Sequence, residues 1–262
     1  MRRQRSLAFL ALGWAACSAG PTEFPSGRLV DLSHAFDEQT IFWPTEEGFV
    51  LERGPAGIGE GGYYYEAHRF RSAEHGGTHI DAPSHFAARR RSVDAIPLEQ
   101  LMGPAVLVDV AERSAADRDY RIRVEDFTAW EAEHGGIPPG AIVLLRTGFG
   151  EFWPDRSAYM GTDERGAQAV AQLHFPGLHA EAARWLVEDR RIAAVGLDTL
   201  SIDFGQSQSF ESHRVLSDAN VPAFENLANL GELPPTGFAV VALPMKIRGG
   251  SGGPLRAVAI VP

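Results

Sequence analysis

The sequence predicts one mixed α/β domain in which helices pack on a mixed β-sheet. Two observations support this fold class. Segments with the apolar pattern of strands alternate along the chain with segments of helical periodicity, and no internal repeat interrupts that order. The chain has 262 residues, 44% hydrophobic and 22% charged, which is enough to bury one large core.

Seven segments have the composition of β-strands. Residues 63–70 alternate aromatic and polar side chains, as expected of a half-buried strand. Most of the others are short apolar runs, typical of central strands. The predicted strands are residues 28–33, 63–70, 105–110, 141–146, 192–197, 238–243 and 255–261.

Three segments have helical periodicity, namely residues 124–133, 179–188 and 212–219. The Gly-rich stretches 57–62 and 248–253 are predicted loops. Neither is a GxGxxG motif between a strand and a helix, so the sequence does not indicate a dinucleotide-binding site.

The N-terminus has the layout of a secretory signal peptide. Arg2, Arg3 and Arg5 precede a short apolar run, and small residues follow it, so residues 1–19 are predicted to be removed from a domain spanning 20–262. Two cleavage sites remain open. Cys17 follows two alanines as in a bacterial lipobox, which would make it a lipid anchor, whereas ordinary cleavage near Ala19 would discard it. Either way we expect an exported protein, periplasmic or secreted.

Charge and composition exclude several classes of partner and chemistry. The formal net charge is −10, and removal of three arginines with the signal peptide leaves 21 minus 34, or −13. Nucleic acid is therefore not expected as a partner. A single cysteine rules out internal disulfides and thiolate metal clusters. The sequence has no GxSxG elbow between a strand and a helix, so a serine hydrolase is disfavoured.

The segment HGGTHIDAPSH at residues 75–85 has the strongest chemical signal. Its four metal-binding side chains are His75, His79, Asp81 and His85, all at odd positions, so an extended chain directs them to one face. Glycines and a proline disfavour a helix there and allow the chain to curl around a common point. Imidazole and carboxylate ligands without thiolates suit Zn²⁺ or Mn²⁺. The alternative is a set of unrelated surface histidines and a turn aspartate.

The same segment resembles the signature of the cyclase-like metal-dependent hydrolases, the family that includes bacterial kynurenine formamidase and isatin hydrolase. Further matching runs lie along most of the chain, and those near the C-terminus are most similar to isatin hydrolase. They are DLSH at 31–34, FWP at 42–44, GLDT at 196–199, FENLANL at 224–230, LPMKI at 243–247 and GGSGGP at 249–254. The resemblance implies a mixed α/β fold of the swivelling β/β/α type with a β-barrel-like centre and surrounding helices, and a homodimer or larger assembly.

The resemblance also assigns site residues. His75, His79 and Asp81 match the metal ligands, and His85 matches the general acid/base. His213 and Glu225 match residues that bind a second metal in formamidases. We expect one tightly held metal here, with His213 and Glu225 forming hydrogen bonds near it.

The expected reaction is hydrolysis of a small aromatic amide by metal-activated water. Opening of isatin to isatinate is the leading expectation, with Phe42, Trp43 and Ser251 binding the substrate. Deformylation of N-formylkynurenine is the first alternative, because Lys246 and Arg248 could hold its carboxylate. An exported metal-binding or ligand-binding protein without turnover is the alternative of a different class.

Overall fold

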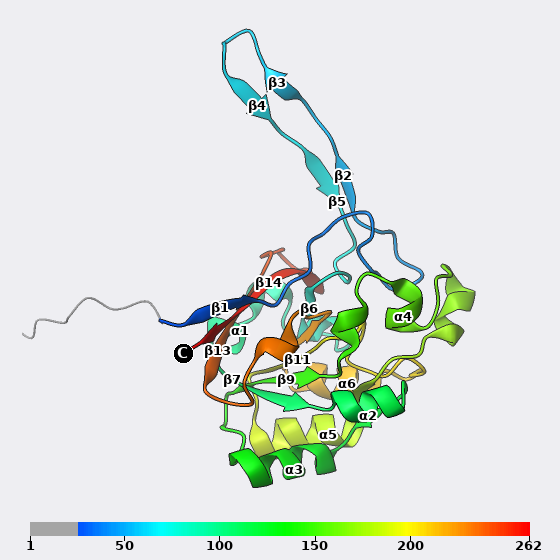
Figure 1. Ribbon diagram of the computed structural model, residues 1–262, viewed down its shortest axis with the longest axis vertical. Coiled ribbons are helices and arrows are strands. Elements are labelled where there is room, and N and C mark those ends of the chain that lie inside the picture. Colours follow the sequence, from blue (N-terminus) through cyan, green and yellow to red (C-terminus); the bar gives the residue numbers. More distant parts are fainter. Residues whose placement is uncertain (1–25) are drawn as a thin grey trace, which may run out of the picture.

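The computed structural model describes residues 26–262 as a closed mixed sheet with helices on its outer side and a long hairpin projecting from it (Figure 1). The strands are β1 Arg28–Asp31, β2 Val50–Glu52, β3 Ala56–Ile58, β4 Tyr64–Glu66, β5 Arg69–Arg71, β6 His79–Asp81, β7 Met102–Asp109, β8 Arg121–Ile122, β9 Ile142–Arg146, β10 Gly177–Leu178, β11 Ala194–Leu197, β12 Ala223–Glu225, β13 Phe238–Pro244 and β14 Gly252–Val261. The α-helices are α1 Leu98–Leu101, α2 Ala111–Ala116, α3 Val124–His134, α4 Arg156–Met160, α5 Ala180–Trp185 and α6 Glu211–Asp218. The predicted signal peptide and Cys17 lie outside the described residues.

Seven strands close the barrel in the order β14-β13-β7-β9-β11-β12-β6. The long strand β14 closes the barrel because its first residues pair with β6 and the following residues pair with β13. Its last residues also pair with β1, which lies outside the ring of seven. Strands β7, β9, β11 and β12 are parallel neighbours, whereas the remaining pairs are antiparallel. The predicted mixed fold with a barrel-like centre is confirmed.

The core lies on both faces of the barrel wall. On β9, Ile142 and Leu144 point into the interior cluster, and Val143 and Leu145 point to a second cluster beneath α3 and α5. This alternation follows from the two-residue period of a strand. Full burial of such side chains contributes about 1.5–3 kcal/mol each. The barrel is thus a rigid support for residues at its rim.

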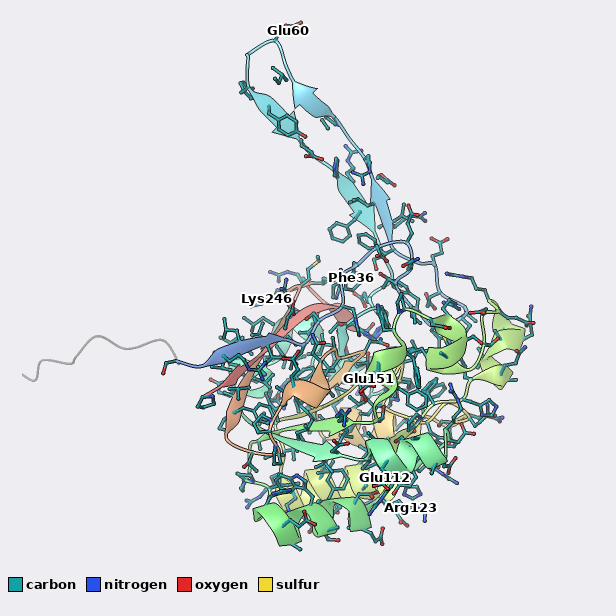
Figure 2. The ribbon with its side chains drawn as sticks, in the orientation of Figure 1. Phe36, Glu60, Glu112, Arg123, Glu151 and Lys246 are labelled. Atoms are coloured by element: carbon teal, nitrogen blue, oxygen red, sulfur yellow. The ribbon has the colours of Figure 1, made fainter. Side chains whose placement is uncertain are left out.

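The aromatic run at 63–70 is not the half-buried strand that its alternation predicts. It forms β4 and the start of β5 in a hairpin arm, residues 50–71, in which β2 pairs with β5 and β3 with β4. The arm projects away from the body, with Glu60 at its tip (Figure 2). Tyr63, Tyr64, Tyr65 and Phe70 are between 53% and 68% exposed. Their alternation therefore marks a two-stranded ribbon with no core behind it.

The other predicted strands and helices are present with small shifts of their ends. The predicted helix at 179–188 is divided into α5 and a π-helical turn, Leu186–Arg190. The Gly-rich stretch 248–253 is a loop up to Ser251, and β14 begins at Gly252. Within residues 26–262, no helix has the length and hydropathy to span a bilayer.

Candidate metal centre

The predicted metal segment curls as its sequence requires. His79 and Asp81 lie on one face of β6 and are 2% and 6% exposed. Gly77 precedes them with a left-handed φ of +56°, and a Cβ there would approach the Phe36 ring to 2.6 Å. Only glycine fits this backbone without strain. The turn brings His75 back toward Asp81, so residues six apart in sequence meet.

One cluster of possible ligands consists of His75, His79 and Asp81, whose ligand atoms lie within 4.8 Å of one another. The Oδ1 atom of Asp81 is 2.7 Å from His75 Nδ1 and 3.3 Å from His79 Nε2. His79 Nε2 is buried and has no hydrogen-bond partner. A buried, unpaired nitrogen beside a carboxylate is destabilising unless a cation joins them. The donor set therefore fits a divalent cation such as Zn²⁺ or Mn²⁺.

A second cluster shares Asp81 and adds His213 from α6 and Glu225 from β12. His213 Nε2 lies 3.1 Å from Asp81 Oδ2 and 3.2 Å from Glu225 Oε1. Its Nδ1 atom lies 2.6 Å from Asp203 Oδ2. Unlike His79, both nitrogens of His213 have partners. The structure therefore brings His213 and Glu225 beside the first cluster, with Asp203 orienting the imidazole.

Electrostatics make the centre attractive to cations. Burial alone would raise the pKa of Asp81, but the charge of His75 and hydrogen bonds with His213 and His75 hold that pKa well below its usual value. Burial opposes a charge on His213, yet hydrogen bonds with Asp203, Asp81 and Glu225 raise its pKa well above the ordinary value. Three buried carboxylates, Asp81, Asp203 and Glu225, thus attract positive charge, either as protons or as a metal ion.

His85 lies beside the clusters and belongs to neither. It ends a 3-10 turn, Pro83–His85, and its ring stacks on that of His75 with centroids 3.7 Å apart. Its Nε2 atom is 4.0 Å from Asp81 Oδ2. Burial lowers the pKa of His85 to about 4, so the imidazole is neutral at pH 7. The neutral ring has a free nitrogen lone pair that can accept a proton, although so low a pKa makes it a weak base.

A cavity of about 550 Å³ opens onto both clusters. Trp43, Phe86 and Phe210 give it an aromatic wall, with ring centroids 6.1 Å apart for Trp43 and Phe210 and 5.3 Å for Phe86 and Phe210. Glu46 and Glu74 also line it. Sequence reasoning missed the two phenylalanines because a lone phenylalanine in a sequence is more often core than pocket. The one usable signal was the position of Phe86 next to His85.

The other predicted substrate contacts lie elsewhere. Phe42 is 1% exposed and packs against Gly76, where a Cβ would come within 2.0 Å of its ring. Ser251 donates a 2.7 Å hydrogen bond to Glu74 Oε2, and its Oγ atom lies 2.9 Å from His75 Nε2. Neither residue lines the cavity, so Phe42 packs and Ser251 supports His75. Lys246 and Arg248 do not line it either.

Known proteins match the sequence over most of the chain. A family model described as "Putative cyclase" matches residues 30–204. An isatin hydrolase from Roseibium aggregatum is 34% identical over 197 residues, covering 72% of each chain. A kynurenine formamidase from Salinibacter ruber is 29% identical over 230 residues, covering 88% of this chain and 96% of its own.

Solved structures agree with the sequence relatives. Isatin hydrolase A from Labrenzia aggregata bound to benzyl benzoate superposes with a TM-score of 0.80 at 34% identity, covering 89% of this chain and 93% of the other. A structure titled as a potential metal-dependent hydrolase with cyclase activity has a TM-score of 0.65 at 26% identity, covering 89% and 98%. The fold is thus shared with solved hydrolases.

Proposed function

The chain belongs to the cyclase family of metal-dependent hydrolases, and on that premise we propose that its substrate is isatin, whose cyclic amide it opens to isatinate. It is a hydrolase, as its relatives are. The observation that supports isatin is the cavity wall: three aromatic rings next to the ligand clusters suit a rigid planar ring.

The charge of the cavity favours isatin over N-formylkynurenine. Its lining, all within the described part of the chain, contains Glu46 and Glu74 and neither lysine nor arginine. The α-carboxylate of N-formylkynurenine would enter without a cationic partner, at an electrostatic cost. Isatin is neutral and needs none. Deformylation therefore remains the alternative function, and the relatives' names disfavour a protein without turnover.

The chain's own residues divide the work of hydrolysis. His75, His79 and Asp81 would hold the cation, which supplies an activated water nucleophile and polarises the amide carbonyl. The aromatic wall orients the fused ring so that its carbonyl faces the clusters. His85 Nε2 takes the proton that the attacking water loses and returns it to the amide nitrogen as the C–N bond breaks. Asp203 and Glu225 hold His213 at the edge of the reacting centre.

Trp43→Ala is expected to lower kcat/KM for isatin selectively. Aromatic stacking contributes about 0.5–1.5 kcal/mol beyond burial, which corresponds to a loss of about 2- to 12-fold. Trp43→Phe is the matched control and should keep most of the activity. Steady-state assays on isatin and N-formylkynurenine give the comparison. A preference of the unaltered enzyme for the formyl substrate, or equal losses on both substrates, contradicts the isatin assignment.

The identity of the metal and the cellular location of the protein are further parts of the proposal. Mn²⁺ and Zn²⁺ both suit two imidazoles and a carboxylate, and metal analysis of the purified protein distinguishes them. Export rests on residues 1–19, outside the described part of the chain. The choice between a lipid anchor at Cys17 and cleavage near Ala19 can be read from the mass of the mature N-terminus.

We also propose a homodimer in which the hairpin arm contacts a second copy. The arm exposes several aromatic side chains, which monomeric proteins seldom display together. The body has further exposed apolar side chains in or next to α1, β7 and β13, namely Leu98, Met102, Leu243 and Met245. Exposed apolar side chains on both the arm and the body suit a two-fold interface, in which each copy gives its arm and receives its partner's.

The dimer predicts a solution mass of twice 28.4 kDa for the full chain. Replacing Tyr65 and Phe70 by Ser should shift the mass measured by light scattering toward the monomer, because both side chains are more than half exposed on the arm. Phe152→Ser, at an exposed phenylalanine outside the arm, is the control and should leave the mass unchanged. A monomeric unaltered protein contradicts the proposal.

A further inference from the structure

A fully buried asparagine connects the two ligand clusters to the body of the fold. Asn226 directly follows Glu225 and is 0% exposed. Its main-chain N–H donates to Thr199 O at 2.9 Å, and its main-chain carbonyl accepts from Thr78 Oγ1 at 2.7 Å. The residue therefore joins the end of β12 to the segment that leads into β6.

The side chain of Asn226 has a fixed orientation. Its Oδ1 atom accepts a 2.8 Å hydrogen bond from the Tyr159 hydroxyl, and its Nδ2 atom donates a 2.7 Å hydrogen bond to Gly77 O. A carbonyl oxygen can only accept, so Nδ2 must face Gly77. Tyr159 is itself buried and thus secures the amide from the other side.

The Gly77 carbonyl also determines the tautomer of His79. His79 Nδ1 lies 2.9 Å from that oxygen and must donate to it, which leaves the lone pair on Nε2, the atom that faces Asp81 and Glu225. The Gly77 carbonyl therefore receives two donors, Asn226 Nδ2 and His79 Nδ1. Gly77 has a left-handed backbone and no side chain to hold its peptide in place.

We propose that Asn226 is a positioning residue for His79: by fixing the Gly77 carbonyl, it keeps His79 in the Nδ1–H tautomer with Nε2 directed at the cation. The proposal rests on the metal role proposed for His79. It assigns to Asn226 no contact with substrate. Hydrogen-bond partners of metal-binding histidines commonly act this way, and their loss costs about 10- to 100-fold in metal affinity.

Asn226→Gly tests the proposal without backbone strain, because Asn226 has a left-handed φ of 54° that glycine adopts freely. Titration of the metal-free protein with Mn²⁺ or Zn²⁺ should show affinity about 10- to 100-fold below that of the unaltered protein. Nitrogen-15 NMR of the Zn²⁺-loaded protein should show His79 bonded to the ion through Nε2 with its proton on Nδ1 in the unaltered chain, and a mixture of forms in the variant. Asn229→Gly is the matched control, since Asn229 has a φ of 56° and donates to Asp31 O outside the centre.

A second variant covers the case in which Asn226→Gly does not fold. Tyr159→Phe removes one neutral hydrogen bond to the amide and should weaken metal binding by roughly 2- to 10-fold. Unchanged metal affinity and an unchanged tautomer in either folded variant overturn the proposal, even if thermal stability falls. Failure of the unaltered protein to bind metal would instead contradict the function proposed for the whole site.

Discussion

Removal of the divalent cation with a chelator is expected to abolish hydrolysis of isatin, and addition of Mn²⁺ or Zn²⁺ is expected to restore it. The physical reason is that the activated water and the polarised carbonyl together account for several kcal/mol of transition-state stabilisation, or roughly 10³-fold or more in rate. In the described chain, His79 Nε2 stays buried and unpaired without a cation.

His79→Ala should give the same loss and should not be rescued by added metal at ordinary concentrations. The variant removes one of the three possible ligands of the first cluster, in which His75 Nδ1 and His79 Nε2 both face Asp81 Oδ1. His174→Ala is the matched control, because His174 is an exposed histidine that also pairs with an aspartate, Asp119, away from the centre. Metal content and turnover of the two variants, measured on the same preparations, give the comparison.

One bound metal per chain is expected, because the first cluster contains a buried nitrogen without a partner, His79 Nε2, whereas His213 and Glu225 leave no such atom in the second. Glu225→Gln should therefore keep that metal. Two ions per chain, with one lost in Glu225→Gln, would show that the second cluster also binds metal. Full turnover in a metal-stripped preparation would contradict the mechanism as a whole.

Much of the centre could be predicted from local sequence. The odd spacing of His75, His79 and Asp81 indicated one face, and the glycines between them indicated a curl, since both properties depend on backbone geometry alone. Three of the four parallel strands, β7, β9 and β11, were also predictable, because their short apolar runs depend on burial from both faces, whereas β12 was not among the predicted strands.

Other features depend on contacts that sequence does not display. Phe86 and Phe210 meet only because α6 packs beside the turn that contains His85. Asn226 reaches Gly77 across 149 residues of chain, so its role follows from the pairing of β12 with β6. The exposed arm was misread because an alternating ribbon looks the same in sequence whether or not a core lies behind it.

His85 should be separable from the ligands by mutation. Its Nε2 atom is 4.0 Å from the nearest Asp81 oxygen, too far for a hydrogen bond, and it belongs to neither ligand cluster. Its ring nevertheless stacks on His75, so its removal could disturb a ligand as well as proton transfer. A useful test must therefore keep the stacking while removing the nitrogens.

His85→Phe meets that requirement and should retain the metal while turnover falls by roughly 10²- to 10⁴-fold, the usual contribution of a positioned acid/base. His85→Ala should show a similar fall in turnover, and any additional metal loss in that variant measures the contribution of stacking to the position of His75. Because the low pKa of His85 leaves the imidazole neutral at pH 7, it can accept the proton of water directly, and neither phenylalanine nor alanine can replace that step. Metal analysis beside single-turnover rates distinguishes the two roles: a metal-free His85→Phe protein would make His85 a ligand, whereas a metal-bound and fully active one would remove it from the mechanism.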